Sequence, residues 1–220
     1  MNSRPEFHVT ESDEPRSRPS RLGVRAAGKA RSRQNLLNAA KRLFMERGYE
    51  GATVRDIAAA AGLSTGAVFA SFADKADLFN EVLVVDIGLQ IQAMKEAVAT
   101  PGPVEARLLR LLEAGYRHHL GQIELLRAAL AVSWSQGLKG ELGDRPIRRA
   151  SMDQIREVLE AGVRSGEIRA GADLELISET LWDCYVRNYR HALFDNWGSD
   201  QLRDHSARQI ELLLAGQRKG

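Results

Sequence analysis

The sequence predicts an all-α protein of about nine helices, in which a small N-terminal domain precedes a larger helical one. Three observations support this fold class. From about Lys29 onwards, apolar residues recur at intervals near the helical period of 3.6 residues. Glycines and capping side chains interrupt that pattern where helices would start and stop. No segment shows the strict alternation typical of a half-buried strand, and no internal repeat is present.

The element boundaries follow from these interruptions. We expect helices over residues 29–47, 54–61, 65–72, 75–99, 104–120, 123–136, 147–165, 173–194 and 199–214. Polar side chains that can accept a backbone N–H are expected to cap five of them: Thr53, Ser64, Asp74, Asp173 and Ser199. Glycines that tolerate positive φ are expected to end three: Gly48, Gly62 and Gly166. The stretch 137–146 is predicted to be a loop.

Two of the apolar stripes make specific predictions about packing. The long fourth helix should bury Leu78, Val82, Val85 and Leu89. The helix over 173–194 carries two stripes, and two stripes need two packing partners. One stripe contains Leu174, Ile177, Leu181, Cys184 and Tyr185, and the other contains Trp182, Val186, Tyr189 and Leu193. Either a second copy of the chain or the rest of the same chain could supply the second partner.

Composition narrows the class of protein. The chain has 220 residues, 44% hydrophobic and 27% charged, which is typical of a soluble globular protein. No apolar run approaches the length of about 18 residues that a membrane span needs. The N-terminus is polar and does not resemble a signal peptide, so the cytoplasm is the expected location. The single cysteine, Cys184, excludes an internal disulfide and a cysteine-based zinc cluster.

The charge is unevenly distributed along the chain. The first 75 residues contain 13 Lys and Arg against 8 Asp and Glu, whereas the remainder contains 18 against 21. A basic N-terminal part suits contact with a polyanion. Residues 1–28 are rich in Pro, Ser and Arg, and we expect them to form a flexible basic arm. This arm either adds phosphate contacts or is simply a solvated tail.

A short helix, a glycine and a second short helix form the most informative motif. Ala58 lets two helices cross closely, Gly62 allows the turn between them, and Leu63 and Val68 fill the small core. This spacing, over residues 54–73, is that of a helix-turn-helix unit, whose second helix enters the DNA major groove. The residues at the start of that second helix are small, which permits close approach to the bases: Ser64, Thr65, Gly66 and Ala67.

The region around this motif resembles the N-terminal domain of the tetracycline-repressor (TetR) family over about residues 30–80. The resemblance rests on Gly48-Tyr49-Glu50-Gly51-Ala52-Thr53-Val54-Arg55-Asp56-Ile57-Ala58, Ala61-Gly62-Leu63-Ser64, Gly66-Ala67-Val68-Phe69, Phe72, Lys75 and Leu78. It implies a basic arm at 1–28, a helix-turn-helix DNA-binding domain at 29–80 and an effector-binding and dimerisation domain at 81–220. It also implies a repressor that a small-molecule effector releases from double-stranded DNA.

The resemblance implies roles for individual residues. Those expected at the DNA are Thr53, Arg55, Ser64, Thr65, Gly66, Ala67, Phe69, Ser71 and Lys75. Thr53 and Lys75 are expected at phosphates, and Thr65, Ala67 and Ser71 at base edges. This chain departs from the family pattern in having Phe69 where a tyrosine is usual and Ala70 where a larger side chain is usual, which puts phosphate contacts by that turn in doubt.

The second domain is expected to bind the effector and to form a homodimer on a palindromic operator. Aromatic and apolar side chains of the middle helices suggest a pocket for an apolar or aromatic molecule. The expected pocket residues are Tyr116, His119, Trp134, Met152, Ile155, Trp182 and Tyr185. The expected dimer interface contains Leu181, Cys184, Asn188, Leu202, Ile210 and Leu213. Each of these residues could equally belong to the ordinary core of one chain.

Other functions remain open at this stage. An enzyme is disfavoured because the sequence has no nucleophile elbow, phosphate loop or metal-spaced cluster, and no cofactor is expected. An accessory DNA-binding protein without an effector is a further alternative. A metal site at His118, His119 and Glu124 is disfavoured because neighbouring helical residues point about 100° apart. A redox role for Cys184 is disfavoured because a lone buried thiol is usually inert.

Overall fold

A computed structural model describes residues 21–135 and 146–218, with side chains described outside 21–27, 132–135 and 146–148. These residues form nine α-helices and no strand beyond an isolated bridge between Ile168 and Arg218. The helices are α1 (Arg21–Gly51), α2 (Val54–Ala60), α3 (Thr65–Phe69), α4 (Lys75–Val98), α5 (Val104–Leu120), α6 (Ile123–Ser135), α7 (Pro146–Ser165), α8 (Leu174–Phe194) and α9 (Ser199–Leu214). The predicted all-α fold of about nine helices is therefore confirmed. Within the described ranges no helix is long and apolar enough to cross a membrane.

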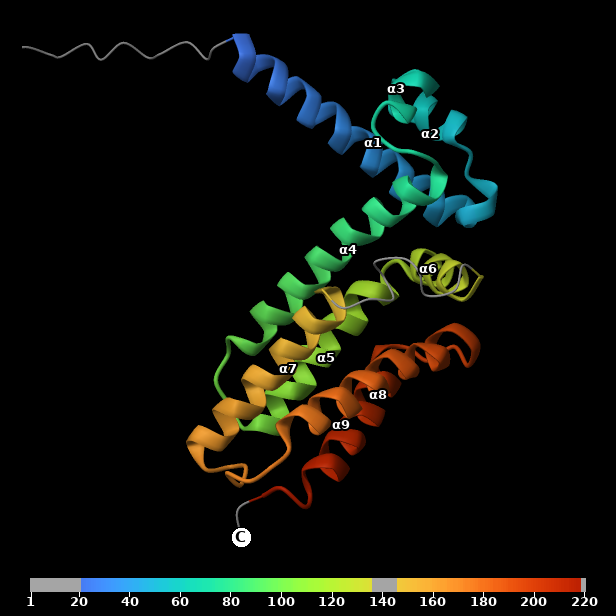
Figure 1. The fold of residues 1–220 in the computed structure, drawn as a ribbon. Coiled ribbons are helices and arrows are strands. Elements are labelled where there is room, and N and C mark those ends of the chain that lie inside the picture. The colour runs from blue at the N-terminus through green and yellow to red at the C-terminus, as the bar shows by residue number, and fades with distance from the viewer. Residues whose placement is uncertain (1–20, 136–145, 219–220) are drawn as a thin grey trace, which may run out of the picture.

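The helices form two lobes connected by α4, which runs from one lobe into the other (Figure 1). The N-terminal lobe contains α1, α2, α3 and the start of α4 around a core that includes Leu36, Phe44, Ile57, Val68 and Phe79. The C-terminal lobe contains the rest of α4 and helices α5 to α9 around a separate apolar core. Helix α6 lies below the N-terminal lobe in Figure 1, and its Leu125 and Ala128 belong to the N-terminal core.

The structure differs from the prediction by several residues at two helix boundaries, and by one residue at one helix cap. Helix α1 begins at Arg21, because residues 21–27 contain Arg, Leu and Ala, which are strong helix formers. Helix α3 ends at Phe69, since the chain then turns and brings Phe72 into the core with 3% exposure. Gly198, not Ser199, precedes the first residue of α9, and its N–H donates to Gln201 Oε1 at 2.8 Å. Residues 21–28 of the predicted arm at 1–28 belong to α1, and residues 1–20 lie outside the described residues. Of the predicted loop at 137–146, Pro146 begins α7, and residues 137–145 lie outside the described part of the chain.

The predicted buried stripe of α4 was only half right. Leu78 and Val82 are buried, but Val85 is 38% and Leu89 is 55% exposed. The inward face continues instead through Leu83, Asp86, Gln90 and Met94. Asp86 and Gln90 are polar but lie on this buried face. A prediction that follows hydrophobicity alone therefore selects the exposed Val85 and Leu89 in their place. The buried Asp86 and Gln90 therefore indicate that the middle of α4 belongs to a polar site.

Candidate functional site

The helix-turn-helix unit has the local geometry that its sequence predicts. Thr53 Oγ1 accepts the N–H of Asp56 at 3.1 Å, and Ser64 Oγ accepts the N–H of Ala67 at 3.2 Å. Between the two helices Gly62 has φ 69°, a conformation that favours glycine. Ala58 is 1% exposed beneath this turn. The caps and the turn together fix the direction of α3 relative to α2.

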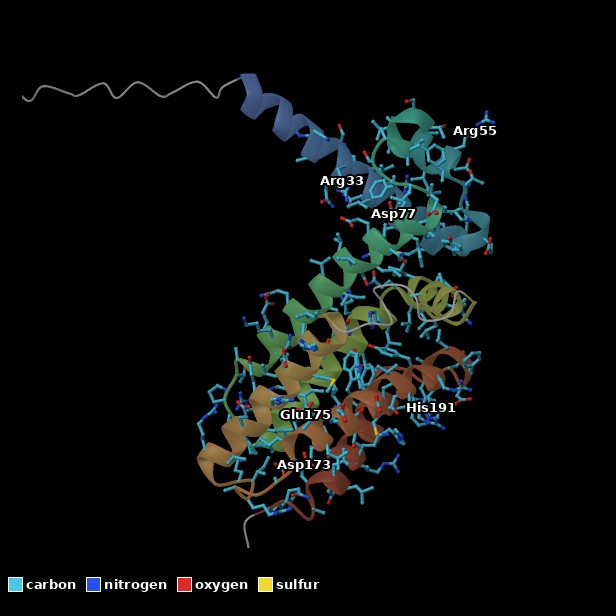
Figure 2. The ribbon with its side chains drawn as sticks, in the orientation of Figure 1. Arg33, Arg55, Asp77, Asp173, Glu175 and His191 are labelled. Atoms are coloured by element: carbon cyan, nitrogen blue, oxygen red, sulfur yellow. The ribbon has the colours of Figure 1, made fainter. Side chains whose placement is uncertain are left out.

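Most residues predicted to contact DNA lie on one exposed surface around α2 and α3. Thr53, Arg55, Ser71 and the residues at the start of α3 are exposed, and Phe69 is 53% exposed. Arg55 projects away from the body of the lobe in Figure 2. The structure thus brings these predicted residues together at one surface, the reading face, which contains Thr53, Arg55, Ser64, Thr65, Gly66, Ala67, Phe69 and Ser71.

Lys75 is positioned differently from its predicted neighbours. Its Nζ donates to the carbonyl oxygen of Tyr49 at 2.9 Å and lies 4.3 Å from the centroid of the Tyr49 ring. The side chain is therefore half-buried between the end of α1 and the start of α4. In this conformation its ammonium group stabilises the packing of α4 against α1, a role that the sequence did not indicate.

A cavity of about 170 Å³ lies between α4, the end of α5, α6 and α8. Its lining is mainly apolar, with a few polar side chains. The apolar lining residues are Leu83, Ile87, Leu125, Leu126, Ala129, Leu130, Trp182 and Val186, and the others are Asp86, Gln90, His119, Tyr185 and Tyr189. Three of the predicted pocket residues, His119, Trp182 and Tyr185, therefore line this cavity.

The other predicted pocket residues do not line the cavity. Tyr116 lies between α5, α8 and α9, where its hydroxyl meets Ser206 Oγ at 3.2 Å and accepts from Asn188 at 3.0 Å. Burial raises the pKa of Tyr116 to about 12. Met152 and Ile155 are core residues of α7, which packs against α4, α5 and α8. The side chain of Trp134 lies outside the described part of the chain.

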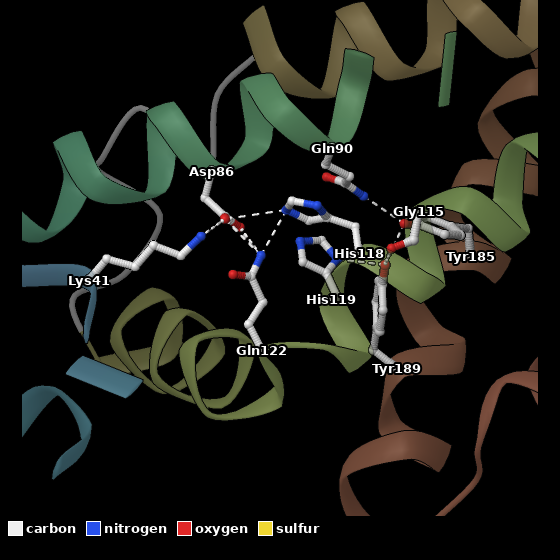
Figure 3. Close-up of polar contacts among 9 residues, drawn as sticks. All are labelled: Lys41, Asp86, Gln90, Gly115, His118, His119, Gln122, Tyr185 and Tyr189. Carbon is white, nitrogen blue, oxygen red and sulfur yellow. Dashed lines mark hydrogen bonds and ion pairs between the residues drawn. The ribbon is translucent and has the colours of Figure 1, made fainter. Parts of the chain in front are cut away.

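A buried chain of hydrogen bonds forms the polar side of the cavity (Figure 3). Gln90 Nε2 donates to the hydroxyl of Tyr185 at 2.6 Å, and the hydroxyls of Tyr185 and Tyr189 contact each other. The Tyr189 hydroxyl also meets His119 Nδ1 at 2.6 Å. Burial lowers the pKa of His119 to about 4, with a further contribution from nearby His118, so the imidazole is neutral at pH 7.

Asp86 connects the cavity to the N-terminal lobe. Lys41 Nζ of α1 donates to Asp86 Oδ1 at 2.6 Å, and Gln122 Nε2 lies 2.7 Å from Oδ1 and 2.8 Å from Oδ2. His118 Nε2 lies 3.2 Å from Oδ1. Burial alone would raise the pKa of Asp86, but the bonds from His118, Lys41 and Gln122 outweigh it and hold the pKa at about 2. An ionised carboxylate in the cavity wall is thus bonded to α1 of the N-terminal lobe.

The three side chains of the disfavoured metal site, His118, His119 and Glu124, do not come together as one group. Glu124 pairs with Arg127 at 3.2 Å, whereas His118 and His119 lie beside Asp86, and one ligand atom from each lies within 4.8 Å of the others. The ammonium of Lys41 already supplies the positive charge next to Asp86. His119 Nδ1 is already bonded to Tyr189. These contacts favour a hydrogen-bond network over a metal centre.

Four of the six residues predicted for a dimer interface were wrong. Leu181, Asn188, Leu202 and Ile210 are each at most 1% exposed and belong to the interior of a single chain. They are buried because α5 and α7 cover the inner faces of α8 and α9. Cys184 and Leu213 are half-buried. The apolar residues that α8 and α9 leave exposed are Leu176, Val186, Phe194 and Leu212.

Known proteins resemble this chain along most of its length. Residues 36–82 match the family of bacterial regulatory proteins described as the tetR family. The transcriptional repressor KstR2 of Rhodococcus jostii is 32% identical over 173 residues, which cover 74% of this chain and 82% of that protein. The transcriptional repressor AcnR of Corynebacterium diphtheriae is 45% identical over 159 residues, covering 70% and 78%.

Solved structures share the fold. A TetR-family regulator from Mesorhizobium loti has a TM-score of 0.68 at 20% identity, covering 86% of this chain and 98% of that one. The regulator FadR of Bacillus subtilis, solved in complex with stearoyl-CoA, has a TM-score of 0.61 at 21% identity, covering 83% and 98%. At these identities the likeness concerns the fold alone.

A helix-turn-helix unit mounted on an all-helical body defines a class of DNA-binding transcriptional regulators. Together with the relatives above, it shows that the chain belongs to the tetR family of bacterial regulatory proteins. Its named relatives are repressors, and this chain is a DNA-binding transcriptional repressor of the same family.

Proposed function

We propose that this repressor acts as a homodimer, binds a palindromic operator and releases it when a small molecule occupies the cavity beside Asp86. The observation that carries this proposal is the bond between Lys41 and Asp86, because it joins α1 of the DNA-binding lobe to the cavity wall. Helix α6 provides a second connection, since Leu125 both lines the cavity and packs in the N-terminal core. A ligand that moves α4 or α6 would therefore move the reading face.

DNA recognition is proposed to use the reading face around α3. The start of α3 carries small exposed side chains, which lets the helix sit deep in the major groove with Thr65, Ala67 and Ser71 at base edges. Arg55 and Thr53 lie at the rim, within reach of backbone phosphates or an outer base. Residues 29–80 are the proposed DNA-binding domain and residues 81–220 the proposed effector and dimerisation domain.

Dimerisation is proposed through the outer faces of α8 and α9. Leu176 and Phe194 are five helical turns apart and share one face of α8, while Leu212 lies exposed on α9. A second copy would cover these apolar side chains and place two α3 helices about one turn of DNA apart, roughly 34 Å. The half-buried Cys184 and Leu213 would lie at the edge of this face.

Selection of bound sequences from a random DNA pool by the full chain tests the proposal. We expect a palindromic consensus with half-sites about 10 base pairs apart, because a dimer presents two equivalent reading faces. A non-palindromic consensus would contradict the dimer. Recovery of unselected sequences would favour the alternative of an accessory DNA-binding protein that binds mainly through phosphate contacts.

A further inference from the structure

The size of the cavity limits what it can hold. Its volume of about 170 Å³ is close to that of an engineered apolar cavity of about 150 Å³ that binds benzene. Aromatic and branched aliphatic side chains form most of its wall, including Leu83, Ile87, Trp182 and Tyr185. The cavity therefore suits one aromatic ring with a short substituent.

The charge of the wall limits the ligand further. Asp86 is the one lining residue among those described that is ionised at pH 7, because His119 and the two tyrosines are neutral there. Among the side chains that the structure describes, no lysine or arginine lines the cavity to receive a carboxylate or phosphate. Lys41, the cation nearest Asp86, comes from α1 and approaches the carboxylate from the side opposite the His119 and Tyr189 rings (Figure 3). An anionic ligand would thus face a negative charge without a cationic partner.

One oxygen of Asp86 has acceptor capacity left. Oδ1 is contacted by Lys41, Gln122 and His118, whereas Oδ2 accepts only from Gln122, which it shares with Oδ1. An ionised carboxylate can accept about four hydrogen bonds, two at each oxygen. Asp86 is nevertheless 3% exposed, so water in bulk does not fill the remaining position. An N–H donor inside the cavity would satisfy Oδ2 without displacing Lys41.

The aromatic side chains in the cavity wall also suit a cation. Trp182 and Tyr185 pack with ring centroids 5.4 Å apart, and Tyr185 and Tyr189 with centroids 5.1 Å apart. Aromatic faces attract ammonium groups through their quadrupole. The cavity thus combines an apolar chamber, a carboxylate with a free acceptor position and a cluster of rings.

We propose, as an extension of the proposed effector control, that the cavity binds a small aromatic amine in its protonated form. The ring lies among the apolar side chains and the ammonium donates to Asp86 Oδ2. This inference concerns the class of effector and rests on the proposed role of the cavity, but its test does not require DNA.

The test compares three probes that share a phenylethyl group, by isothermal titration calorimetry on the full chain at pH 7. The probes are 2-phenylethylamine, which is cationic, 2-phenylethanol, which is neutral, and 3-phenylpropanoate, which is anionic. We expect the amine to bind about tenfold more tightly than the alcohol, because a charge-assisted hydrogen bond is roughly twice as strong as a neutral one. The carboxylate is expected to bind more weakly than either.

Two substitutions test whether a preference for the amine over the alcohol depends on Asp86. Asp86→Asn keeps the shape of the side chain but removes its charge, so the advantage of the amine over the alcohol should disappear. Lys41→Met removes the cation that shares the carboxylate, so affinity for the amine should rise several-fold while affinity for the alcohol stays constant. Lys95→Met, an exposed position on α4, removes the same charge away from the cavity and serves as the control.

Each contrary outcome overturns the inference. These outcomes are equal binding of the three probes, binding of none, or an amine preference that survives Asp86→Asn. Failure of the proposed function has a different signature. If the amine binds with the expected preference but does not release selected DNA, the class of ligand stands and the control of DNA binding by this cavity is wrong.

Discussion

At the residue scale, close packing at Gly115 illustrates how the cavity wall is built. A Cβ at Gly115 of α5 would overlap the hydroxyl of Tyr185, which is held in place by Gln90 and Tyr189. The absence of a side chain on α5 therefore lets a tyrosine of α8 approach the backbone and join the hydrogen-bond chain. This requirement is a property of the packed helices, because nothing in the neighbouring sequence distinguishes Gly115 from an ordinary glycine.

We predict that Gly115→Ala destabilises the protein by about 1–3 kcal/mol, because the Tyr185 ring must move out of a well-packed position. Gly88→Ala is the matched control, since Gly88 lies in the exposed middle of α4 and an added Cβ there meets no atom within 4 Å. It should stabilise the helix by up to about 1 kcal/mol. Chemical denaturation measures both changes, and equal effects of the two substitutions would refute the packing argument.

Acid sensitivity is a second prediction at this scale. Burial lowers the pKa of His119 from 6.5 to about 4, so between these pH values the unfolded chain binds a proton that the folded chain does not. The free energy of unfolding should therefore fall by on the order of 3 kcal/mol as the pH drops from 6.5 to 4. His119→Gln should flatten this part of the curve. Below pH 4, protonation of Asp86 should reduce stability further in both proteins.

At the element scale, the short helix α3 depends on its neighbours for its position. A helix of five residues is too short to be stable alone, and here Ser64 caps it while Val68 anchors it in the core. Lys75 supports the same arrangement from α4, because its ammonium bonds the carbonyl of Tyr49 at the end of α1. In the proposed mode of DNA binding, α3 would therefore read the bases, and Lys75 of α4 would support the packing of the lobe.

We predict that Thr65→Ala and Lys75→Ala have different effects on DNA binding. Thr65→Ala should relax the base preference at one position of each half-site by about 1 kcal/mol, roughly fivefold. Lys75→Ala should weaken binding to all sequences alike, because it loosens the packing of α4 on α1. Affinities for a panel of single-base operator variants measure both, and the reverse pattern would show that Lys75 reads bases and Thr65 only supports the fold.

At the scale of the whole molecule, α4 and α6 make the two lobes mechanically dependent. Helix α4 belongs to both lobes, and Asp86 on it is bonded to Lys41 of α1. Helix α6 contributes residues to the cavity and to the N-terminal core. In the proposed dimer, the spacing of the two reading faces must be fixed. Only then does a change in either lobe alter the affinity for the operator.

We predict that Leu212→Glu shifts the protein from dimer to monomer, with the dimer dissociation constant raised at least about tenfold. The reason is that Leu212 is 77% exposed in one chain, so a charge there costs little until a second copy buries it. Val84→Glu, at an exposed apolar position on α4, should leave the dimer intact and is the control. Sedimentation velocity measures both, and a dimer unaffected by Leu212→Glu would place the interface elsewhere.

The sequence by itself determined the order of the helices, four of the five expected caps (Thr53, Ser64, Asp74 and Asp173) and the exposed position of the residues expected at DNA. These features depend on residues that are close together in the sequence. Ser64 accepts the N–H of Ala67, and Gly62 forms the turn between two helices. Interactions of this kind can be predicted from a short sequence pattern. Leu181 and Ile210 were expected at the dimer interface but are buried within a single chain. A stripe of apolar residues indicates that a helix face is covered, but it does not indicate whether the same chain or a second copy covers it.

Only the tertiary structure decided the cavity and its connection to the DNA-binding lobe. Lys41, Asp86 and Gln122 are far apart in the chain, and their bonds exist because α1, α4 and the segment just before α6 meet at one place. Polar residues on an otherwise apolar helix face look like interruptions in a sequence. They become a site when folding supplies their partners, since a buried charge is tolerated only where it is paired and hydrogen-bonded.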